Sequence, residues 1–403
     1  MAHIEPFPAL RPRPQIAGQL CELPYDVMSS AEARQIARGK PFSFLHVSKP
    51  EIDLPDVTDP YSPQVYEKGR ENFSRLIADG ALKQDEQPFF YFYRQIMGNH
   101  SQVGLVAAAS CQDYLDGIIK KHEFTRPDKE NDRVRHIEIL NSQTGPVFLA
   151  FRASQQFDSI AKTQTAAAPD TDFLGSDGVR HTSWTVRDPA TIKTLHDAFA
   201  AIPYLYIADG HHRSAAAARV FQSRKGAGQS GFFLTVIFPH NQLQILSYNR
   251  VLRDLNGLTP QELLKKLESV FEFTGGASQP AAKNQLSLYM EGQWRPIRFR
   301  PDCVAGRALL DSLDVSLLQD HVLGPIFGID DQRTSKRINF VGGIRGPSEL
   351  EKLVNSKEYA CAFSMFPTSM EDLMAIADAG GIMPPKSTWF EPKLRDGMFC
   401  HMI

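Results

Sequence analysis

The chain has 403 residues, of which 42% are hydrophobic and 22% are charged, and its formal net charge is -2. This composition is typical of a folded globular protein with room for two domains. The near-neutral charge argues against a general attraction to nucleic acid or to an anionic membrane. The proline-rich start has no apolar core of the kind a signal peptide needs, and apolar runs such as 231–238 are too short to span a bilayer. We therefore expect a cytoplasmic protein that binds neither DNA nor membranes.

The five cysteines are widely scattered, and none belongs to a Cys-x-x-Cys pair. That spacing argues against a zinc knuckle or a thioredoxin-type redox site, because both need cysteines close together in the sequence. Buried free thiols in a reducing compartment are the expected state.

The first half of the chain alternates between helix and strand patterns. Ser29 or Ser30 is a good N-cap for the first helix, Gly80 is a plausible stop for the second, and Gly98-Asn99 is typical of a hairpin turn. The patterns predict helices over 31–38, 64–79 and 191–200, and strands over 42–47, 89–96, 102–111, 146–152 and 182–186.

The second half contains fewer clear elements. Asp128 is the expected N-cap of a helix, and Thr259 with Pro260 predicts the start of another. The patterns predict helices over 129–141 and 259–269, a strand ending at Asp209, and paired strands over 232–239 and 243–250. The strands are too irregularly spaced for a doubly wound sheet, so the expected class is α+β with mixed sheets and packed helices. A weak linker pattern at 279–284 divides the chain into a main region, 1–280, and a C-terminal α+β region, 281–403, packed on it.

The segment Asp209-Gly210-His211-His212-Arg213 is the most informative in the chain. It follows an apolar strand and precedes an alanine-rich helix expected to begin at His212 or Arg213. A helix N-terminus presents unpaired N–H groups and a partial positive charge, which suit a phosphate. Gly210 allows a close backbone approach, and Arg213 can donate to two phosphate oxygens. The pattern favours an anion site over a structural turn.

A charged loop before residue 127 is a second candidate. His122, Glu123, Thr125 and Arg126 lie together where Pro127 bends the chain. In the following helix, Asp132 with Arg135 and Glu130 with Arg133 have the spacing of ion pairs across a solvated face.

Two weaker candidates remain. A proline-rich C-terminal segment contains Lys386, Ser387 and Thr388. Its sequence is equally compatible with binding an anion and with lying across a core without binding a ligand. Tyr25-Asp26 suits an Asx-type turn better than a polar site. The other histidines are interpreted as isolated structural or exposed residues: His3, His46, His100, His181, His196, His240, His321 and His401.

The same segments resemble a bacterial and archaeal family known as domain-of-unknown-function family 1015. The resemblance runs nearly end to end and rests on four segments in order: 24–27, 122–125 with Asp132-Arg133, 206–213 and 383–390. The family has no settled activity, so the resemblance implies a fold more than a function.

A more distant resemblance concerns the turn alone. Asp209 to Arg213, followed by Ala215-Ala216, is similar to the nucleotide-binding turn of the ParB and sulfiredoxin superfamily, which includes CTP-binding partition proteins, sulfiredoxins and free-serine kinases. The resemblance implies a ParB/sulfiredoxin-like core in which Gly210, His211, His212 and Arg213 contact nucleotide phosphates and Asp209 orients the turn or assists metal or proton transfer. Histidines stand where sulfiredoxin has its catalytic cysteine, and no DNA-binding helix pair is visible. The resemblance therefore favours a kinase.

These observations predict nucleotide-dependent phosphoryl transfer to a small metabolite, for which free serine or a related hydroxy or amino acid is a candidate. ATP or ADP with Mg²⁺ is the cofactor that the resemblance implies. The catalytic candidates are Asp209, Glu123 and His122, and the nucleotide-binding candidates are Gly210, His211, His212, Arg213, Arg126, Arg133 and Lys386. A metal-dependent hydrolase or phosphatase, and a non-catalytic nucleotide sensor, are the alternatives.

Overall fold

The computed structural model describes residues 1–57 and 59–403, and these form two compact units. Unit 1 comprises Met1–Lys121, Thr125–Leu243 and Pro392–Ile403, and unit 2 comprises His122–Phe124 and Gln244–Glu391. The domain boundary expected at residues 280–281 falls within unit 2. The chain therefore leaves unit 1 and returns to it at the C-terminus.

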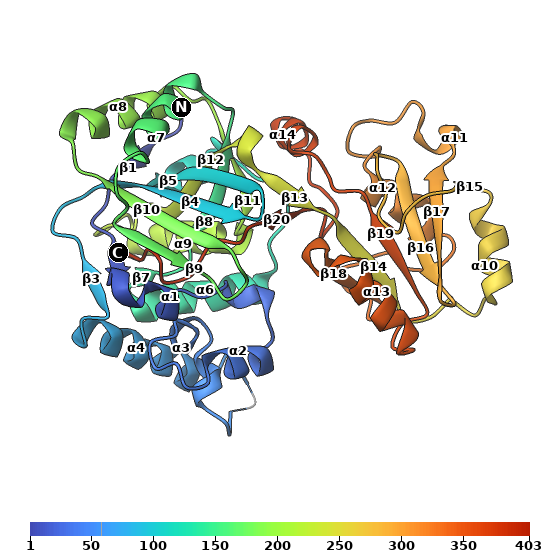
Figure 1. Ribbon diagram of the computed structural model, residues 1–403, viewed down its shortest axis with the longest axis horizontal. Coiled ribbons are helices and arrows are strands. Elements are labelled where there is room, and N and C mark those ends of the chain that lie inside the picture. Colours follow the sequence, from blue (N-terminus) through green and yellow to red (C-terminus); the bar gives the residue numbers. More distant parts are fainter. Residues whose placement is uncertain (58) are drawn as a thin grey trace. The chain divides into compact units, whose positions relative to one another are not determined.

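A large mixed sheet forms the centre of unit 1 (Figure 1). Within the described residues its strands follow the order β6-β11-β8-β12-β5-β4-β10-β9, and β1 pairs with β5 off this path. Pairing is antiparallel except between β11 and β6 and between β12 and β8. The bounds are β1 Ile4–Glu5, β4 Phe90–Met97, β5 His100–Ser110, β6 Ile119–Lys120, β8 Val147–Phe151, β9 Thr171–Leu174, β10 Arg180–Val186, β11 Leu205–Asp209 and β12 Phe232–Pro239.

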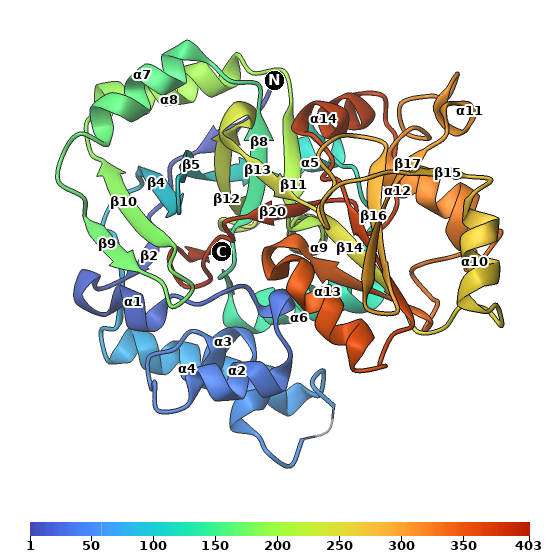
Figure 2. The ribbon, with the colours of Figure 1, turned by 45° about the vertical axis from the view of Figure 1, so that its right-hand side comes forward.

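Helices and two short ladders surround this sheet. Helices α7 and α8 lie side by side, and α2, α3 and α4 form another group (Figures 1 and 2). The ladders pair β2 (Leu10–Pro12) with β3 (Leu82–Gln84) and β7 (Ser142–Gln143) with β21 (His401–Met402). The helices are α1 Ala17–Leu20, α2 Ser30–Ala37, α3 Leu45–Ser48, α4 Pro63–Ala78, α5 Cys111–Leu115, α6 Pro127–Leu140, α7 Gln155–Gln164, α8 Pro189–Ala200 and α9 His211–Arg224, with 3-10 turns η1 Pro14–Ile16, η2 Tyr25–Val27, η3 Pro50–Asp53 and η4 His240–Gln242.

Apolar side chains on β4, β5, β8, β11 and β12 form the main core of unit 1. The small residues of α9 let this helix pack closely on its neighbours, and Ala216 and Val220 lie against Ile137 of α6. Burial of these faces removes apolar surface from water, which is the main favourable contribution to folding. The packing holds the start of α9 at the end of β11.

Unit 2 contains a second sheet, of antiparallel strands in the order β15-β17-β16-β19-β14-β18. A separate pair joins β13 (Gln244–Leu246) to β20 (Trp389–Glu391). Helix α10 lies beside β15 in both views (Figures 1 and 2). The remaining elements are β14 Tyr248–Leu252, β15 Phe271–Phe273, β16 Gln285–Met290, β17 Gln293–Phe299, β18 Ile338–Gly342, β19 Cys361–Met365, α10 Pro260–Leu267, α11 Pro301–Val304, α12 Asp314–Leu318, the π-helical turn η5 Gln319–Leu323, η6 Gly343–Arg345, α13 Gly346–Asn355 and α14 Met370–Asp378.

Most elements with strong local signals are confirmed. Ser29 and Thr259 each form a capping box at the start of the predicted helices α2 and α10. The β4–β5 hairpin turns at Gly98, which has a positive φ of 56°. The mixed α/β content and the mixed sheet of unit 1 agree with the expected class. In the described chain, no helix combines the length and apolarity needed to cross a membrane.

Three expectations are wrong. Residues 42–47 do not form a strand, because Leu45–Ser48 is a helix that buries Leu45 and Val47. Helix α6 begins at Pro127, so Asp128 is in its first turn and is not the N-cap; proline favours the first helical position. Strand β12 does not pair with residues 243–250, because it lies between β5 and β8.

The core of unit 1 yields a stability prediction. Leu149 of β8 is fully buried, so Leu149→Ala should lower the free energy of unfolding by about 2–5 kcal/mol. Leu115→Ala is the matched control, because that side chain is 38% exposed and its truncation should cost much less. Urea unfolding monitored by circular dichroism measures both. Equal losses in the two variants would show that this sheet does not carry the core.

Candidate functional site

The turn between β11 and α9 is shaped by Gly210. This residue is the N-cap of α9 and has a φ of 96°, which favours glycine, and the helix begins at His211, one residue earlier than expected. A Cβ atom at Gly210 would lie 3.4 Å from Cα of Val147. The amide of Ser214 donates to the Gly210 carbonyl over 3.0 Å and closes the first helical turn. The left-handed φ is therefore what requires glycine here, since an added Cβ would only touch β8 in ordinary van der Waals contact.

Asp209 is held in place by a charged partner from the C-terminal segment. Its Oδ1 accepts a hydrogen bond from the amide of Gly210 at 2.9 Å, and its Oδ2 lies 3.1 Å from Nζ of Lys393. Burial alone would raise the pKa of this carboxyl, but the positive charges of Lys393 and Arg213 outweigh burial and hold the pKa far below its usual value. Asp209 is therefore an ionised group that fixes the turn, and it is a weak base.

Arg213 is a buried arginine in the first turn of α9. Its Nη1 donates to the carbonyl of Pro146 at 2.5 Å, and its Nη2 lies 3.9 Å from Oδ2 of Asp26. Burial acts to lower the pKa of Arg213, but the carboxylates of Asp26 and Asp209 raise it overall, so the guanidinium stays charged. A buried cation beside a helix N-terminus is suited to an anion.

Asp26 is the residue that the sequence interpretation undervalued. It lies in η2, and 42% of its side chain is exposed, so it is the accessible carboxylate beside Arg213. A lone Tyr-Asp pair after a proline is common in turns, so its local pattern favours a turn over a polar site. Only the fold brings it to Arg213.

Arg133 and its neighbours form the next part of the cluster. The Arg133 guanidinium lies 3.8 Å from the ring centroid of Tyr25. Its Nη2 donates to Oδ2 of Asp132 at 2.7 Å, and the hydroxyl of Tyr66 donates to Oδ1 of the same residue at 2.8 Å. The ion pairs expected three residues apart are replaced by other contacts, since Asp132 pairs with the adjacent Arg133, and Glu130 pairs with Arg219 of α9.

A second buried carboxylate, Asp396, belongs to the same cluster. Its amide and carbonyl pair with Glu22, and a Cβ atom at Gly145 would lie only 2.6 Å from its Oδ1. Burial raises the pKa of Asp396 to about 7, although Arg213 and Arg133 act to lower it. A carboxyl with a pKa near neutrality can exchange a proton at physiological pH, which is common at functional sites.

The predicted loop residues divide between the two units. In unit 1, the amide of Arg126 donates to Nε2 of His212 at 3.0 Å, so this part of the loop contacts the turn. His122, Glu123 and Lys386 belong to unit 2. There, the amide of Met383 donates to the carbonyl of His122 at 2.8 Å, and Nζ of Lys386 lies 5.4 Å from the ring centroid of Tyr248.

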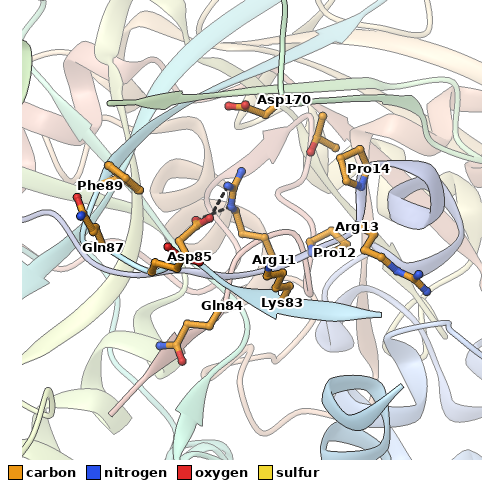
Figure 3. A pocket seen from close by; sticks show the side chains of 12 residues that line it. Arg11, Pro12, Arg13, Pro14, Lys83, Gln84, Asp85, Gln87, Phe89 and Asp170 are labelled. Carbon is orange, nitrogen blue, oxygen red and sulfur yellow. Dashed lines mark hydrogen bonds and ion pairs between the residues drawn. The ribbon is translucent and has the colours of Figure 1, made fainter. Parts of the chain in front are cut away.

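Unit 1 also has a pocket of about 430 Å³ whose lining includes none of the predicted site residues (Figure 3). Arg11 donates through Nε and Nη2 to the two carboxylate oxygens of Asp85, both at 2.7 Å. This pairing neutralises the central cation of the pocket. The pocket is lined by Arg11, Pro12, Arg13, Pro14, Lys83, Gln84, Asp85, Glu86, Gln87, Phe89, Asp170 and Thr171.

The fold and the site define a mixed α/β protein with a buried charged cluster at a strand-to-helix turn. The chain belongs to the family described as "Protein of unknown function (DUF1015)", whose model matches residues 4–316. Curated proteins provide no significant sequence match.

Several solved structures show a remote likeness to the chain. A conserved hypothetical protein from Pyrococcus furiosus is 15% identical, with a TM-score of 0.37, and the match covers 74% of this chain and 95% of that one. A free serine kinase in complex with AMP is 14% identical, with a TM-score of 0.37, over 71% and 86% of the two chains. SbnI with a C-terminal truncation, from Staphylococcus aureus, is 11% identical, with a TM-score of 0.40, over 72% and 85%.

The turn yields a prediction about Gly210. Gly210→Ala should destabilise unit 1 by about 1–3 kcal/mol, because the φ of 96° is strained for alanine. Gly98→Ala is the matched control, since its φ of 56° lies in the left-handed helical region that other residues can adopt, and no atom lies within 4 Å of the added Cβ. Thermal unfolding of both variants measures the difference. A cost at Gly98 as large as at Gly210 would contradict the role of the strained φ at Gly210.

Asp396 yields a pH prediction. A carboxyl whose folded pKa is raised binds more protons in the folded state, so it makes stability fall as pH rises from about 4 to about 7. Asp396→Asn should remove this contribution, and the difference between the variant and the wild type should grow in the variant's favour over that range. Urea midpoints measured across these pH values provide the test. Parallel pH profiles for the two proteins would disprove a raised pKa.

Proposed function

We propose that this chain binds ATP or ADP and transfers a phosphoryl group to a small metabolite. Free serine or a related hydroxy or amino acid is the proposed acceptor. The observation that carries the proposal is the buried, charged Arg213 beside the N-terminus of α9, after a turn whose left-handed backbone Gly210 supplies. Phosphoryl transfer depends mainly on positioning and on neutralising phosphate charge, and this site has the groups for both.

The phosphate contacts are proposed to come from the turn and its flanks. The N–H groups at the start of α9 and the guanidinium of Arg213 provide donors, and His211 and His212 stand beside them in the first turn. Arg126 contacts His212 through its amide, and its exposed guanidinium, now paired with Asp128, is proposed to turn to a bound polyphosphate. Arg133 adds positive charge next to Tyr25. Lys386 of unit 2 is proposed as a further cation that binds the nucleotide.

Carboxylates of the site are proposed to have different roles. Asp209 is paired with Lys393 and orients the turn. Asp26 faces Arg213 and is exposed, so it fits as a ligand for Mg²⁺ or as the acceptor of a proton from the substrate hydroxyl. Mg²⁺ bound with the nucleotide would neutralise phosphate charge. Glu123 and His122 of unit 2 remain candidates for the same proton.

The proposed reaction transfers the terminal phosphoryl group of the nucleotide to the hydroxyl group of the acceptor. The acceptor's hydroxyl oxygen forms a bond to the terminal phosphorus of the nucleotide, and the bond from that phosphorus to the bridging oxygen breaks. The hydroxyl proton passes to a carboxylate, and the departing nucleotide keeps the electron pair of the broken bond. Arg213 stabilises the negative charge that develops on the phosphate oxygens.

The resemblance of Asp209 to Arg213 to the ParB and sulfiredoxin superfamily supports a nucleotide as the ligand, and within that superfamily it supports a kinase. The superfamily includes free-serine kinases, so serine and adenine nucleotides are the first compounds to test. We also propose that the nine-stranded sheet of the described chain contains the ParB/sulfiredoxin-like core.

A metal-dependent hydrolase is less well supported. Asp209 is a candidate ligand for the metal ion of such an enzyme, but its carboxylate is engaged by Lys393, and a lysine ammonium competes with a cation for that oxygen. A non-catalytic nucleotide sensor has the same binding contacts as the kinase. It differs only in turnover.

Nucleotide binding tests the role of Arg213. Arg213→Ala should weaken ADP or ATP binding roughly 10–150-fold, because a hydrogen bond to a charged group contributes about 1.5–3 kcal/mol. Arg213→Lys keeps the charge but not the planar guanidinium, so its affinity for the nucleotide should lie between those of the wild type and Arg213→Ala. Arg219→Ala on the same helix should bind normally, because Arg219 pairs with Glu130. Isothermal titration calorimetry on folded variants measures these affinities.

Turnover distinguishes the proposed kinase from the sensor. Wild-type protein is incubated with ATP or ADP, Mg²⁺ and serine, and phosphoserine is detected by mass spectrometry. A phosphorylated product that needs both substrates, and that Asp26→Asn strongly reduces, supports the transferase. Binding without a product from any hydroxy or amino acid supports the sensor. No nucleotide binding, with Arg213→Ala indistinguishable from wild type, would falsify the proposal.

A further inference from the structure

We propose that His3, Glu5 and His196 form a binding site for a divalent transition-metal ion such as Zn²⁺. Each residue offers one donor atom, and the donor atoms all lie within 4.8 Å of one another in unit 1. The sequence interpretation of His3 and His196 as isolated residues is wrong, because the fold brings β1 and α8 together. The proposal is independent of the proposed kinase activity.

The spacing of the donor atoms fits an ion with little movement. Nε2 of His3 lies 2.8 Å from Oε1 of Glu5, and Nε2 of His196 lies 3.7 Å from the same oxygen. Around a tetrahedral zinc ion with bonds of about 2.0–2.1 Å, neighbouring donor atoms are about 3.3 Å apart. One observed distance is shorter than this value and the other is longer. Small side-chain rotations therefore bring both to the required separation.

The backbone that carries the donors is fixed. Glu5 pairs with Ala108 in the sheet, and the amide of His3 donates to Oδ2 of Asp113 at 2.6 Å. The His3 ring also packs edge-on against Phe232, with centroids 5.3 Å apart. On α8, Leu195 is fully buried and anchors the turn that presents His196. A ligand set on such rigid elements loses little conformational freedom on binding.

The donor types indicate the class of ion. Two imidazoles and one carboxylate suit Zn²⁺ and related first-row ions better than Mg²⁺ or Ca²⁺, which prefer oxygen ligands alone. The side chains of His3, Glu5 and His196 are 49%, 38% and 40% exposed, which leaves a path for the ion and room for a water ligand. The bound ion would cross-link β1 to α8.

The competing interpretation is an ion pair without a metal. A protonated His3 beside Glu5 gives the same short contact, but it needs no second imidazole. A metal ion bound by His3 and the preceding backbone amides would also not need His196. Those amides are already engaged, because Ala2 donates to the carbonyl of Ile202 and His3 donates to Asp113. His196 is therefore the residue that distinguishes the alternatives.

The test uses full-length, untagged protein freed of metal with a chelator. Calorimetric titration with Zn²⁺ above neutral pH, without nucleotide, should show one saturable equivalent, and Zn²⁺ should raise the Tm. His196→Gln should weaken Zn²⁺ binding by roughly 10–100-fold or more, since even mutating a residue that only hydrogen-bonds to a metal ligand weakens binding by that factor. His100→Gln, a partly exposed histidine that contacts Gln102 on β5, is the matched control and should bind as wild type.

Two further variants make the outcome unambiguous. Glu5→Gln keeps the size and hydrogen bonding of the side chain but removes its charge, so it should weaken Zn²⁺ binding without unfolding the protein. His3→Gln should do the same. No saturable binding by the wild type overturns the proposal. Binding that His196→Gln leaves unchanged also overturns it, because the ion is then held by other donors.

Discussion

The ion pair between Asp209 and Lys393 is the constraint on which the site depends. It joins the end of β11 to the segment that enters unit 1 after the chain has completed unit 2. The same segment places Asp396 among Arg213, Arg133 and Asp26, and its Arg395 donates to Asp177 and His181. A buried ion pair adds little net stability, because desolvation offsets attraction, but it specifies one arrangement of its partners.

Much of the fold could be predicted from local sequence signals. The capping boxes at Ser29 and Thr259, the Gly98 hairpin and the apolar strand before Asp209 all depend on neighbours within a few residues, and the structure confirms each. Residues 42–47 were mistaken for a strand because a short apolar run is compatible with either a strand or a buried helical turn. The partners of β12 could not be predicted, because sheet order depends on packing between distant segments.

The residues of the candidate site also divide into those with a local sequence signal and those that only long-range contacts bring to the site. Gly210, His211 and Arg213 were recognisable because their types and order are unusual within five residues. Lys393 and Asp396 were not, since each is 180 residues or more from Arg213 and neither has a distinctive local pattern. Asp26 was recognisable only as a weak candidate, because its contact with Arg213 is equally distant in the sequence. The sequence pattern indicates Lys386 as the C-terminal cation of the site, whereas the cation that contacts Asp209 lies a few residues further on, at Lys393. Long-range charge pairing is a property of the fold and is not encoded in local spacing.

The return of Pro392–Ile403 to unit 1 has a consequence for the order of folding. These residues supply β21, the partner of β7, together with Lys393 and Asp396, and they are synthesised after all of unit 2. Domains of a growing chain generally fold from the N-terminus as they emerge. Here unit 1 stays incomplete until the whole of unit 2 has been synthesised. A chain that stops before Pro392 lacks Lys393 and Asp396 and cannot assemble the charged cluster.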